Sequence, residues 1–245
     1  MVEVKGLTKY YGKKAALDGV DLTLPRGEIV GLFGENGAGK TTLMKCLLGY
    51  VKYQGEISLD GEPISRKNIE KLSFATCEHS FFYNLSPAEH RDFYKDHFST
   101  FKERRFQALM DFFQLPMHKR AGSFSTGQKN QLEVILAMCQ GADYILMDEP
   151  FAGNDIFNRE DFYKVLLGVL EPDETVLLST HLLEEVEHFI GRALLLHRGK
   201  LVGDVTTVEL EEQGRSLVDF VKTTYRYQAD RVSRALRELT GEEEP

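Results

Sequence analysis

The sequence predicts an α/β protein with a mainly parallel central sheet, and three observations lead to this. The first is a glycine-rich segment, residues 34–41, between a predicted buried strand and a predicted helix. The second is a set of continuous apolar runs at 144–147, 175–179 and 193–196, which are typical of strands buried on both faces of a parallel sheet. The third is that helical stretches separate these runs, and alternating strands and helices favour parallel pairing.

The N-terminal part has the pattern of an antiparallel β subdomain. Residues 2–9 and 15–24 alternate apolar and polar side chains, so we expect two strands with a loop over residues 10–14 between them. Residues 55–59 predict another strand, which ends in a tight turn at Asp60-Gly61.

A helical insertion is expected over about residues 78–140. Helical periodicity runs through 88–98, 101–113 and 127–137 and predicts three helices there. From about residue 206 to 245 the chain mixes helix and strand signals and forms a C-terminal extension. No internal repeat and no Pro/Gly/Ser-rich linker divides the chain, so residues 1–245 are expected to form a single domain.

Composition excludes several classes of function. The chain is 42% hydrophobic and 28% charged, as in an ordinary globular protein, and its net charge of −8 argues against general binding to nucleic acid. No apolar stretch approaches the roughly 18 residues of a membrane-spanning helix, and the N-terminus lacks a secretory signal. The three scattered cysteines form no metal-binding pair. These features predict a cytoplasmic protein.

The glycine-rich segment fits the phosphate-binding pattern G-x-x-x-x-G-K-[ST] and lies between a strand at 28–33 and a helix at 42–49. Its glycines let backbone N–H groups point at phosphate oxygens beside a helix N-terminus. We expect Lys40 to reach the β- and γ-phosphates and the Thr41 hydroxyl to hold Mg²⁺. The residues expected to bind the nucleotide here are Gly34, Asn36, Gly37, Ala38, Gly39, Lys40, Thr41 and Thr42.

Two carboxylates follow the apolar run at 144–147. At the carboxyl end of a parallel strand, Asp148 and Glu149 are expected to lie beside the phosphate loop. Asp148 would bind Mg²⁺, usually through a water, because this ion requires hard oxygen ligands. Glu149 would orient or deprotonate the water that attacks the γ-phosphorus. A solvated acidic turn is the alternative, and the buried strand before the pair makes it less favoured.

Residues 124–128, Phe-Ser-Thr-Gly-Gln, open a predicted helix with Ser125 or Thr126 as its N-cap. Free N–H groups and the helix dipole make such a position an anion site. In isolation a capped helix is the simpler interpretation. A functional role is favoured because the segment precedes Asp148-Glu149 by about 20 residues.

Together these motifs resemble the ATP-binding cassette family, the motor subunits of ABC transporters, over nearly the whole chain. Residues 34–42 resemble its phosphate loop, 124–128 its signature and 144–149 its second acidic motif. The resemblance implies a P-loop NTPase core. It also places Tyr11 where the family stacks an aromatic ring on adenine, and His181 where it has its switch histidine.

The resemblance further implies a head-to-tail pair of cassettes, identical or different, with ATP and Mg²⁺ between them. Ser125, Gly127 and Gln128 of one subunit would contact the ATP held by Lys40 of the other, and Asp155 lies at the position of the D-loop. The pair would drive separate transmembrane permease subunits from the inner face of the cell membrane, with the helical insertion carrying the docking groove. The motifs are closest to those of bacterial exporters, so export is expected.

Three positions depart from the family pattern. Cys77 stands where the Q-loop has glutamine, and because a thiol is a poor Mg²⁺ ligand, Glu78 is the candidate to supply the oxygen. Thr126 replaces the first glycine of the signature, and Asn154 replaces an apolar residue of the D-loop. Neither of these last two changes removes a catalytic group, so activity is still expected.

Three alternatives stay open. A soluble ABC protein acting on the ribosome or on DNA would carry two cassettes or long coiled coils, which this chain lacks. A phosphate-loop kinase would turn over as a monomer and tolerate Ser125→Arg. A degenerate cassette paired with an active one would lack the catalytic set of Lys40, Asp148, Glu149 and His181, which this chain has.

Overall fold

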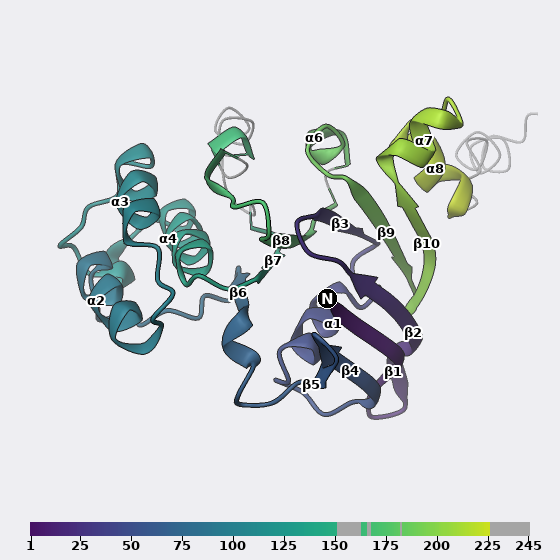
Figure 1. Ribbon diagram of the computed structural model, residues 1–245, viewed down its shortest axis with the longest axis horizontal. Helices are drawn as coiled ribbons and strands as arrows, with labels where there is room; N and C mark the ends of the chain where they lie inside the picture. Colours follow the sequence, from purple (N-terminus) through teal and green to yellow (C-terminus); the bar gives the residue numbers. More distant parts are fainter. Residues whose placement is uncertain (151–162, 166–167, 182, 226–245) are drawn as a thin grey trace, which may run out of the picture.

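The computed structural model describes residues 1–150, 163–165, 168–181 and 183–225 (Figure 1). The expectations for Asn154 and Asp155 fall on residues outside these ranges. No helix in the described part is long and apolar enough to cross a bilayer. A central sheet, an antiparallel sheet and a group of helices beyond one sheet edge make up the fold (Figure 1).

The central sheet has six strands in the order β10-β9-β3-β8-β7-β6, and all neighbours except β9 and β10 run parallel. The predicted mainly parallel core is therefore confirmed. Its strands are β3 (Ile29–Phe33), β6 (Leu72–Thr76), β7 (Tyr144–Asp148), β8 (Thr175–Ser179), β9 (Arg192–His197) and β10 (Lys200–Thr206). The sequence analysis did not identify β6 as a strand.

Burial on both faces explains the continuous apolar runs. In β7, Tyr144 and Leu146 pack in one core with α1 and the antiparallel sheet, while Ile145 and Met147 pack in a second core with α4. All five residues of β7 and all five of β8 are buried. A strand with helices or a second sheet on each side has no face left for polar side chains.

The second sheet is antiparallel, in the order β2-β1-β4-β5, as predicted for the N-terminal part. Its strands are β1 (Val2–Tyr11), β2 (Lys14–Leu24), β4 (Gln54–Leu59) and β5 (Glu62–Pro63). The prediction of a loop over residues 10–14 was wrong. Tyr10 pairs with Ala15 and Tyr11 with Lys14, because the ladder continues to a connection of only Gly12 and Lys13.

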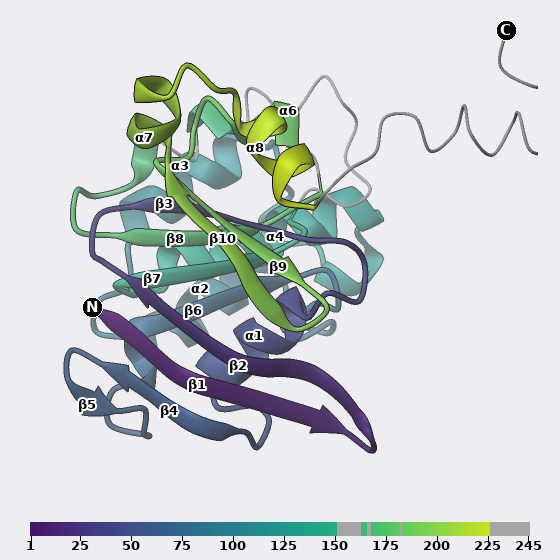
Figure 2. The ribbon, with the colours of Figure 1, turned by 90° about the vertical axis from the view of Figure 1, so that its right-hand side faces the viewer.

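Helix α1 (Lys40–Leu47) lies between the two sheets (Figure 2). Helices α2 (Pro87–His97), α3 (Glu103–Phe112) and α4 (Thr126–Cys139) follow β6 and precede β7, and they fall within the range predicted for the insertion. Because β6 and β7 are neighbours, the helical segment leaves the sheet and returns beside its starting point. Helix α4 packs on β6 and β7 and joins the segment to the core.

The described part of the C-terminal extension is mainly helical, with α7 (Thr207–Glu212) and α8 (Leu217–Thr224) after β10. Helix α6 (Leu183–Val186) follows β8 and precedes the extension. Leu210, Leu217 and Val221 bury their side chains in the same core as α4. The extension is thus packed onto the central sheet as far as residue 225.

Candidate functional site

The phosphate-binding loop leaves β3 and enters α1 through positions that only glycine fills. Gly37 and Gly39 have φ angles of 81° and 115°, in the left-handed region. A Cβ at Gly39 would lie 2.5 Å from the carbonyl oxygen of Ala16, and one at Gly34 would lie 2.4 Å from that of Leu196. The loop is therefore held against the neighbouring backbone, with its N–H groups at the N-terminus of α1.

Lys40 is the buried cation of the site. Its side chain is 7% exposed, and Nζ donates to the carbonyl oxygen of Gly34 at 2.7 Å. The same ammonium lies 4.0 Å from Glu149 Oε1. A buried ammonium that is satisfied by a backbone carbonyl can exchange that contact for a phosphate oxygen, which binds it more strongly.

A hydroxyl from α1 and a carboxylate from β7 meet at the end of the sheet. The Thr41 hydroxyl donates to Asp148 Oδ2 at 2.5 Å, and the Ser179 hydroxyl donates to Oδ1 at 2.5 Å. Asp148 is 4% exposed. The sheet register brings these groups together, because Asp148 of β7 lies opposite Ser179 of β8.

This oxygen pair fits Mg²⁺, which prefers hard oxygen ligands and keeps several waters. The described residues contain no cluster of three or more His, Cys, Asp or Glu side chains that could enclose a metal. Thr41 and Asp148 would therefore hold the ion together with phosphate oxygens and water rather than within a protein cage.

Glu149 has an unusual backbone conformation. Its φ is 49°, and its N–H donates to the backbone carbonyl and the hydroxyl of Ser179, both at 3.1 Å. A left-handed non-glycine residue that the surrounding structure holds in place is often found at a functional site. The turn directs the carboxylate toward Lys40 on one side and His181 on the other, with His181 Nδ1 3.0 Å from Oε2.

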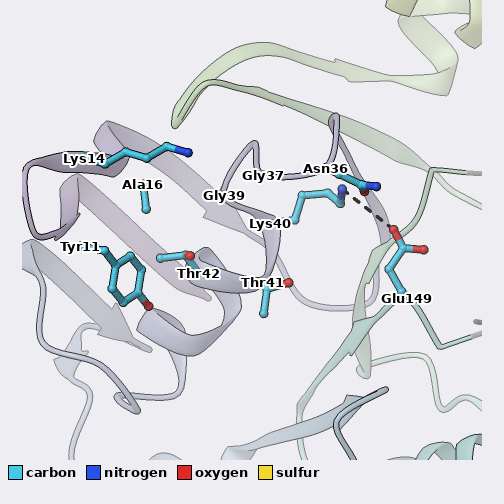
Figure 3. A pocket seen from close by; sticks show the side chains of 10 residues that line it. All are labelled: Tyr11, Lys14, Ala16, Asn36, Gly37, Gly39, Lys40, Thr41, Thr42 and Glu149. Carbon is cyan, nitrogen blue, oxygen red and sulfur yellow. Dashed lines mark ion pairs between the residues drawn. The ribbon is translucent and has the colours of Figure 1, made fainter.

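A cavity of about 250 Å³ extends along the phosphate-binding loop. Figure 3 shows Tyr11 and Lys14 at one end, Lys40 in the middle and Glu149 at the other end. The Tyr11 side chain is 52% exposed, and Lys9 Nζ lies 4.8 Å from the centroid of its ring. Lys14 and Ala16 also line the cavity. The sequence analysis missed these two residues because only the hairpin of β1 and β2 brings them beside the loop.

The signature segment is separate from this cavity. Ser125 is the N-cap of α4 and forms a capping box: its hydroxyl accepts from Gln128 N at 3.2 Å, and Gln128 Oε1 accepts from Ser125 N at 3.1 Å. Ser125 is exposed, and neither it nor Gly127 nor Gln128 lines the cavity. The predicted cap is confirmed, and the structure does not bring the signature to the phosphate loop of the same chain.

Cys77 and Glu78 follow β6 near the acidic pair. Burial, and then the carboxylate of Asp148, raise the pKa of the Cys77 thiol. Cys77 lines a narrow hollow together with Glu149 and Glu133. The Glu78 carboxylate pairs with Lys45 Nζ at 3.0 Å and is 68% exposed. A metal contact from Glu78 stays a prediction.

A buried carboxylate on α4 holds the segment after β6, and the sequence analysis missed it. Glu133 is 3% exposed and accepts from Ser80 N at 3.0 Å and from the Ser80 hydroxyl at 2.6 Å. Beside it, His79 Nε2 lies 2.7 Å from Asn130 Oδ1. Burial raises the pKa of Glu133, and the hydrogen bonds from Ser80 oppose that rise. The one signal in the sequence is a charge within the apolar run 132–138.

The sequence profile of the family described as ABC transporter matches residues 17–152, more than half of the chain. The chain belongs to the ABC transporter family. The SkfA peptide export ATP-binding protein SkfE of Bacillus subtilis (strain 168) is 32% identical over 220 residues, which cover 87% of this chain and 92% of SkfE. The lantibiotic transport ATP-binding protein SrtF of Streptococcus pyogenes is 28% identical over 204 residues, 82% of this chain and 89% of SrtF.

Among solved structures, an ATP-binding subunit of an ABC transporter superposes with a TM-score of 0.82 at 25% identity, over 92% of this chain and 99% of that one. The predicted family and fold are thus confirmed. This ABC protein is an ATP-binding, ATP-hydrolysing transporter subunit. The geometry around Lys40, Thr41 and Asp148 is the part of the molecule suited to holding a triphosphate.

Proposed function

We propose that this ABC subunit works as one half of a head-to-tail pair, in which the signature of a second subunit completes each ATP site. One observation carries the proposal: Ser125 and Gly127 lie outside the cavity that Lys40 and Thr41 line in the same chain. Ser125 is exposed, and among the described residues its hydroxyl is bonded within its own cap. An exposed helix N-terminus with free N–H groups suits an anion that another subunit presents.

Within each site the side chains have separate roles. Lys40 and the loop N–H groups bind the phosphates and neutralise charge as the γ-phosphoryl group transfers to water. Thr41 and Asp148 hold Mg²⁺, which supplies charge neutralisation to the phosphate oxygens when bound. Glu149 accepts a proton from the attacking water, and His181 holds that carboxylate and contacts the γ-phosphate. Tyr11 stacks on the adenine.

The site also contains partners for these groups before ATP binds. Lys40 donates to the Gly34 carbonyl oxygen and Asp148 accepts from two hydroxyls, so each of these buried charges has a partner. ATP binding exchanges these contacts for contacts with phosphate and metal. Little of the backbone needs to move, which favours fast binding and release.

The pair is proposed to act on separate transmembrane subunits at the inner face of the cell membrane and to export peptides. The similarity to SkfE and SrtF supports this substrate class. Phe82 and Tyr83, which follow the turn after β6, are 51% and 46% exposed. Exposed aromatic side chains are enriched at protein–protein contacts, so this end of the helical segment is the proposed docking surface.

Mixing two inactive variants tests the pairing. Lys40→Ala removes the phosphate contact, and Ser125→Arg fills the signature with a bulky side chain; each variant alone should lose hydrolysis. In a mixed pair, Lys40 of one subunit faces Ser125 of the other, so one site is intact. We expect the mixture to regain up to about a quarter of the parent rate, because half of the pairs are mixed and each has one working site.

Two differently tagged subunits, co-purified in the presence of ATP, establish that mixed pairs form. If mixed pairs form and no hydrolysis returns, the head-to-tail arrangement is wrong. Full hydrolysis by Ser125→Arg alone would favour turnover by a single subunit.

A further inference from the structure

Tyr225 follows helix α8 and reaches the base of the phosphate-binding loop. Its hydroxyl donates to the carbonyl oxygen of Leu196 at 3.1 Å and lies 3.5 Å from that of Phe33. Phe33 is the last residue of β3 and is 2% exposed, and Leu196 in β9 is fully buried. A side chain from the C-terminal extension therefore touches two neighbouring strands of the central sheet at once.

These two carbonyls border the loop directly. Gly34, the first residue of the phosphate-binding loop, follows Phe33, and the Leu196 oxygen occupies the space where a Gly34 Cβ would lie, at 2.4 Å. The ladder between β3 and β9 reaches the pair Phe33 and Leu195, and beyond it the loop leaves the sheet. The Tyr225 hydroxyl adds a cross-link at the point where backbone pairing stops.

Leu196 connects to the loop by a second route. The turn after β9 contains Gly199, whose N–H donates to the Ala38 carbonyl at 2.9 Å, and Ala38 belongs to the phosphate-binding loop. The Gly199 carbonyl in turn accepts from Asp18 N at 2.9 Å. A shift of the β9 end would therefore displace the loop at both of its sides.

The position of Tyr225 is fixed by packing. Helix α8 buries Leu217 and Val221 and contacts α6, the short helix that follows His181; Figure 2 shows α8 beside α6. The Tyr225 ring lies 5.4 Å from the ring of His197, at the end of β9. Burial raises the pKa of Tyr225 to about 12, so the phenol keeps the proton that it donates throughout the neutral range.

We propose that Tyr225 is a positioning residue of the ATP site, whose hydroxyl holds the ends of β3 and β9 together and thereby sets the geometry of the phosphate-binding loop. The C-terminal helix then becomes part of the nucleotide-binding machinery without touching the nucleotide. The inference rests on ATP binding by residues 34–41 and is independent of the pairing proposed above, because the loop and Tyr225 belong to the same chain.

Tyr225→Phe tests the proposal because it removes the hydroxyl and keeps the ring. ADP binding to the full chain, measured by titration calorimetry, avoids any effect of hydrolysis or of ATP-dependent pairing. Loss of a hydrogen bond to a buried carbonyl should weaken ADP binding about 3- to 10-fold. The KM for ATP should rise by a similar factor while kcat stays within about twofold, since no catalytic group is removed.

Tyr144→Phe is the control for removing a buried phenol hydroxyl from the same sheet without losing a hydrogen bond, because this hydroxyl has no hydrogen-bond partner among the described residues. Tyr144 is fully buried in the same sheet, but it is the first residue of β7 and lies at the other end of that strand from Asp148. This variant should leave ADP affinity unchanged. Hydrogen exchange of the amides of residues 34–39 gives a second readout, and Tyr225→Phe should accelerate their exchange more than that of other core amides.

The proposal is overturned if Tyr225→Phe binds ADP as tightly as the parent with unchanged exchange in residues 34–39. It is also overturned if Tyr144→Phe weakens ADP binding equally, since the effect would then be one of general stability. Should Tyr225→Phe be too unstable to titrate, exchange measured on the folded fraction at low temperature decides between these outcomes.

Discussion

The phosphate-binding edge of the central sheet and the signature end of α4 are proposed to act in one reaction, yet they are built differently. At the sheet edge, Lys40 and Asp148 are buried, Asp148 accepts from Thr41, 107 residues away, and Lys40 lies 4.0 Å from Glu149. At the signature, Ser125 is exposed, and its hydrogen bonds among the described residues are local ones to Gln128 and Lys129. The first region is a pocket already shaped for its ligand, and the second is an exposed surface that the proposed pairing would bring to the ATP of another subunit.

The difference follows from how each region satisfies its polar groups. A buried charge needs a partner from the protein, so the sheet edge depends on tertiary contacts. A helix N-terminus can satisfy its first N–H groups by a cap of neighbouring residues and still bind an anion there. Substitutions that act on only one of the two regions test this difference.

The largest difference is expected between the effects of replacing one lysine in each region. Lys40→Ala should abolish hydrolysis and weaken ATP binding by about 10- to 100-fold, because a charge-assisted contact to phosphate is lost. Lys129→Ala, on the first turns of α4, removes a cation that lies over the Tyr83 ring. This second variant should bind ATP as the parent does. Titration with a fluorescent ATP analogue checks both, and equal losses would remove the distinction between the regions.

Glu149→Gln should separate binding from chemistry at the sheet edge. The amide keeps the shape of the side chain but cannot accept a proton from water, so the hydrolysis rate should fall by about 10²- to 10⁴-fold. ATP affinity should be retained, since Lys40 and Thr41 are unchanged. Phosphate release and nucleotide binding measured on one sample check this. A variant with near-parent turnover would show that Glu149 is not the base.

Glu133→Gln should act on the attachment of the helical segment rather than on the nucleotide. Gln offers one acceptor where Ser80 uses two carboxylate oxygens, so the free energy of unfolding should fall by about 1–3 kcal/mol. ATP affinity should change little. Denaturant unfolding measures the first quantity. Ser80→Ala is the control, because it removes the hydroxyl but keeps the N–H bonds and should cost less.

The pH dependence of the destabilisation by Glu133→Gln follows from the pKa of Glu133. Burial raises this pKa in the folded state above its ordinary 4.5. A carboxyl group whose pKa is raised by folding stabilises the folded state at pH values below its pKa in the unfolded chain. This stabilisation is lost as the pH rises through its pKa in the folded chain. The destabilisation by Glu133→Gln should therefore be largest below pH 4.5 and shrink as the pH rises through the pKa of Glu133 in the folded state. A difference that grows with pH would contradict the direction of the shift.

Local pattern predicted much of this protein. The apolar runs located β7, β8 and β9, because a strand covered on both faces admits few polar residues. The order of motifs located the phosphate loop and the pair Asp148 and Glu149. Pattern failed at residues 10–14, which were expected to form a loop, because backbone pairing extends both strands as far as the turn at Gly12 and Lys13.

From the sequence alone, most of the strands, the glycine-rich loop and the side chains suited to bind a triphosphate could be predicted, since local patterns and motifs indicate them. Which of those side chains contact one another depends on the tertiary structure. Thr41 and Asp148 are 107 residues apart, and Tyr225 and Phe33 are 192 apart. Their contacts depend on strand order and register, which a local pattern does not encode, because pairing is fixed by the burial of the whole sheet.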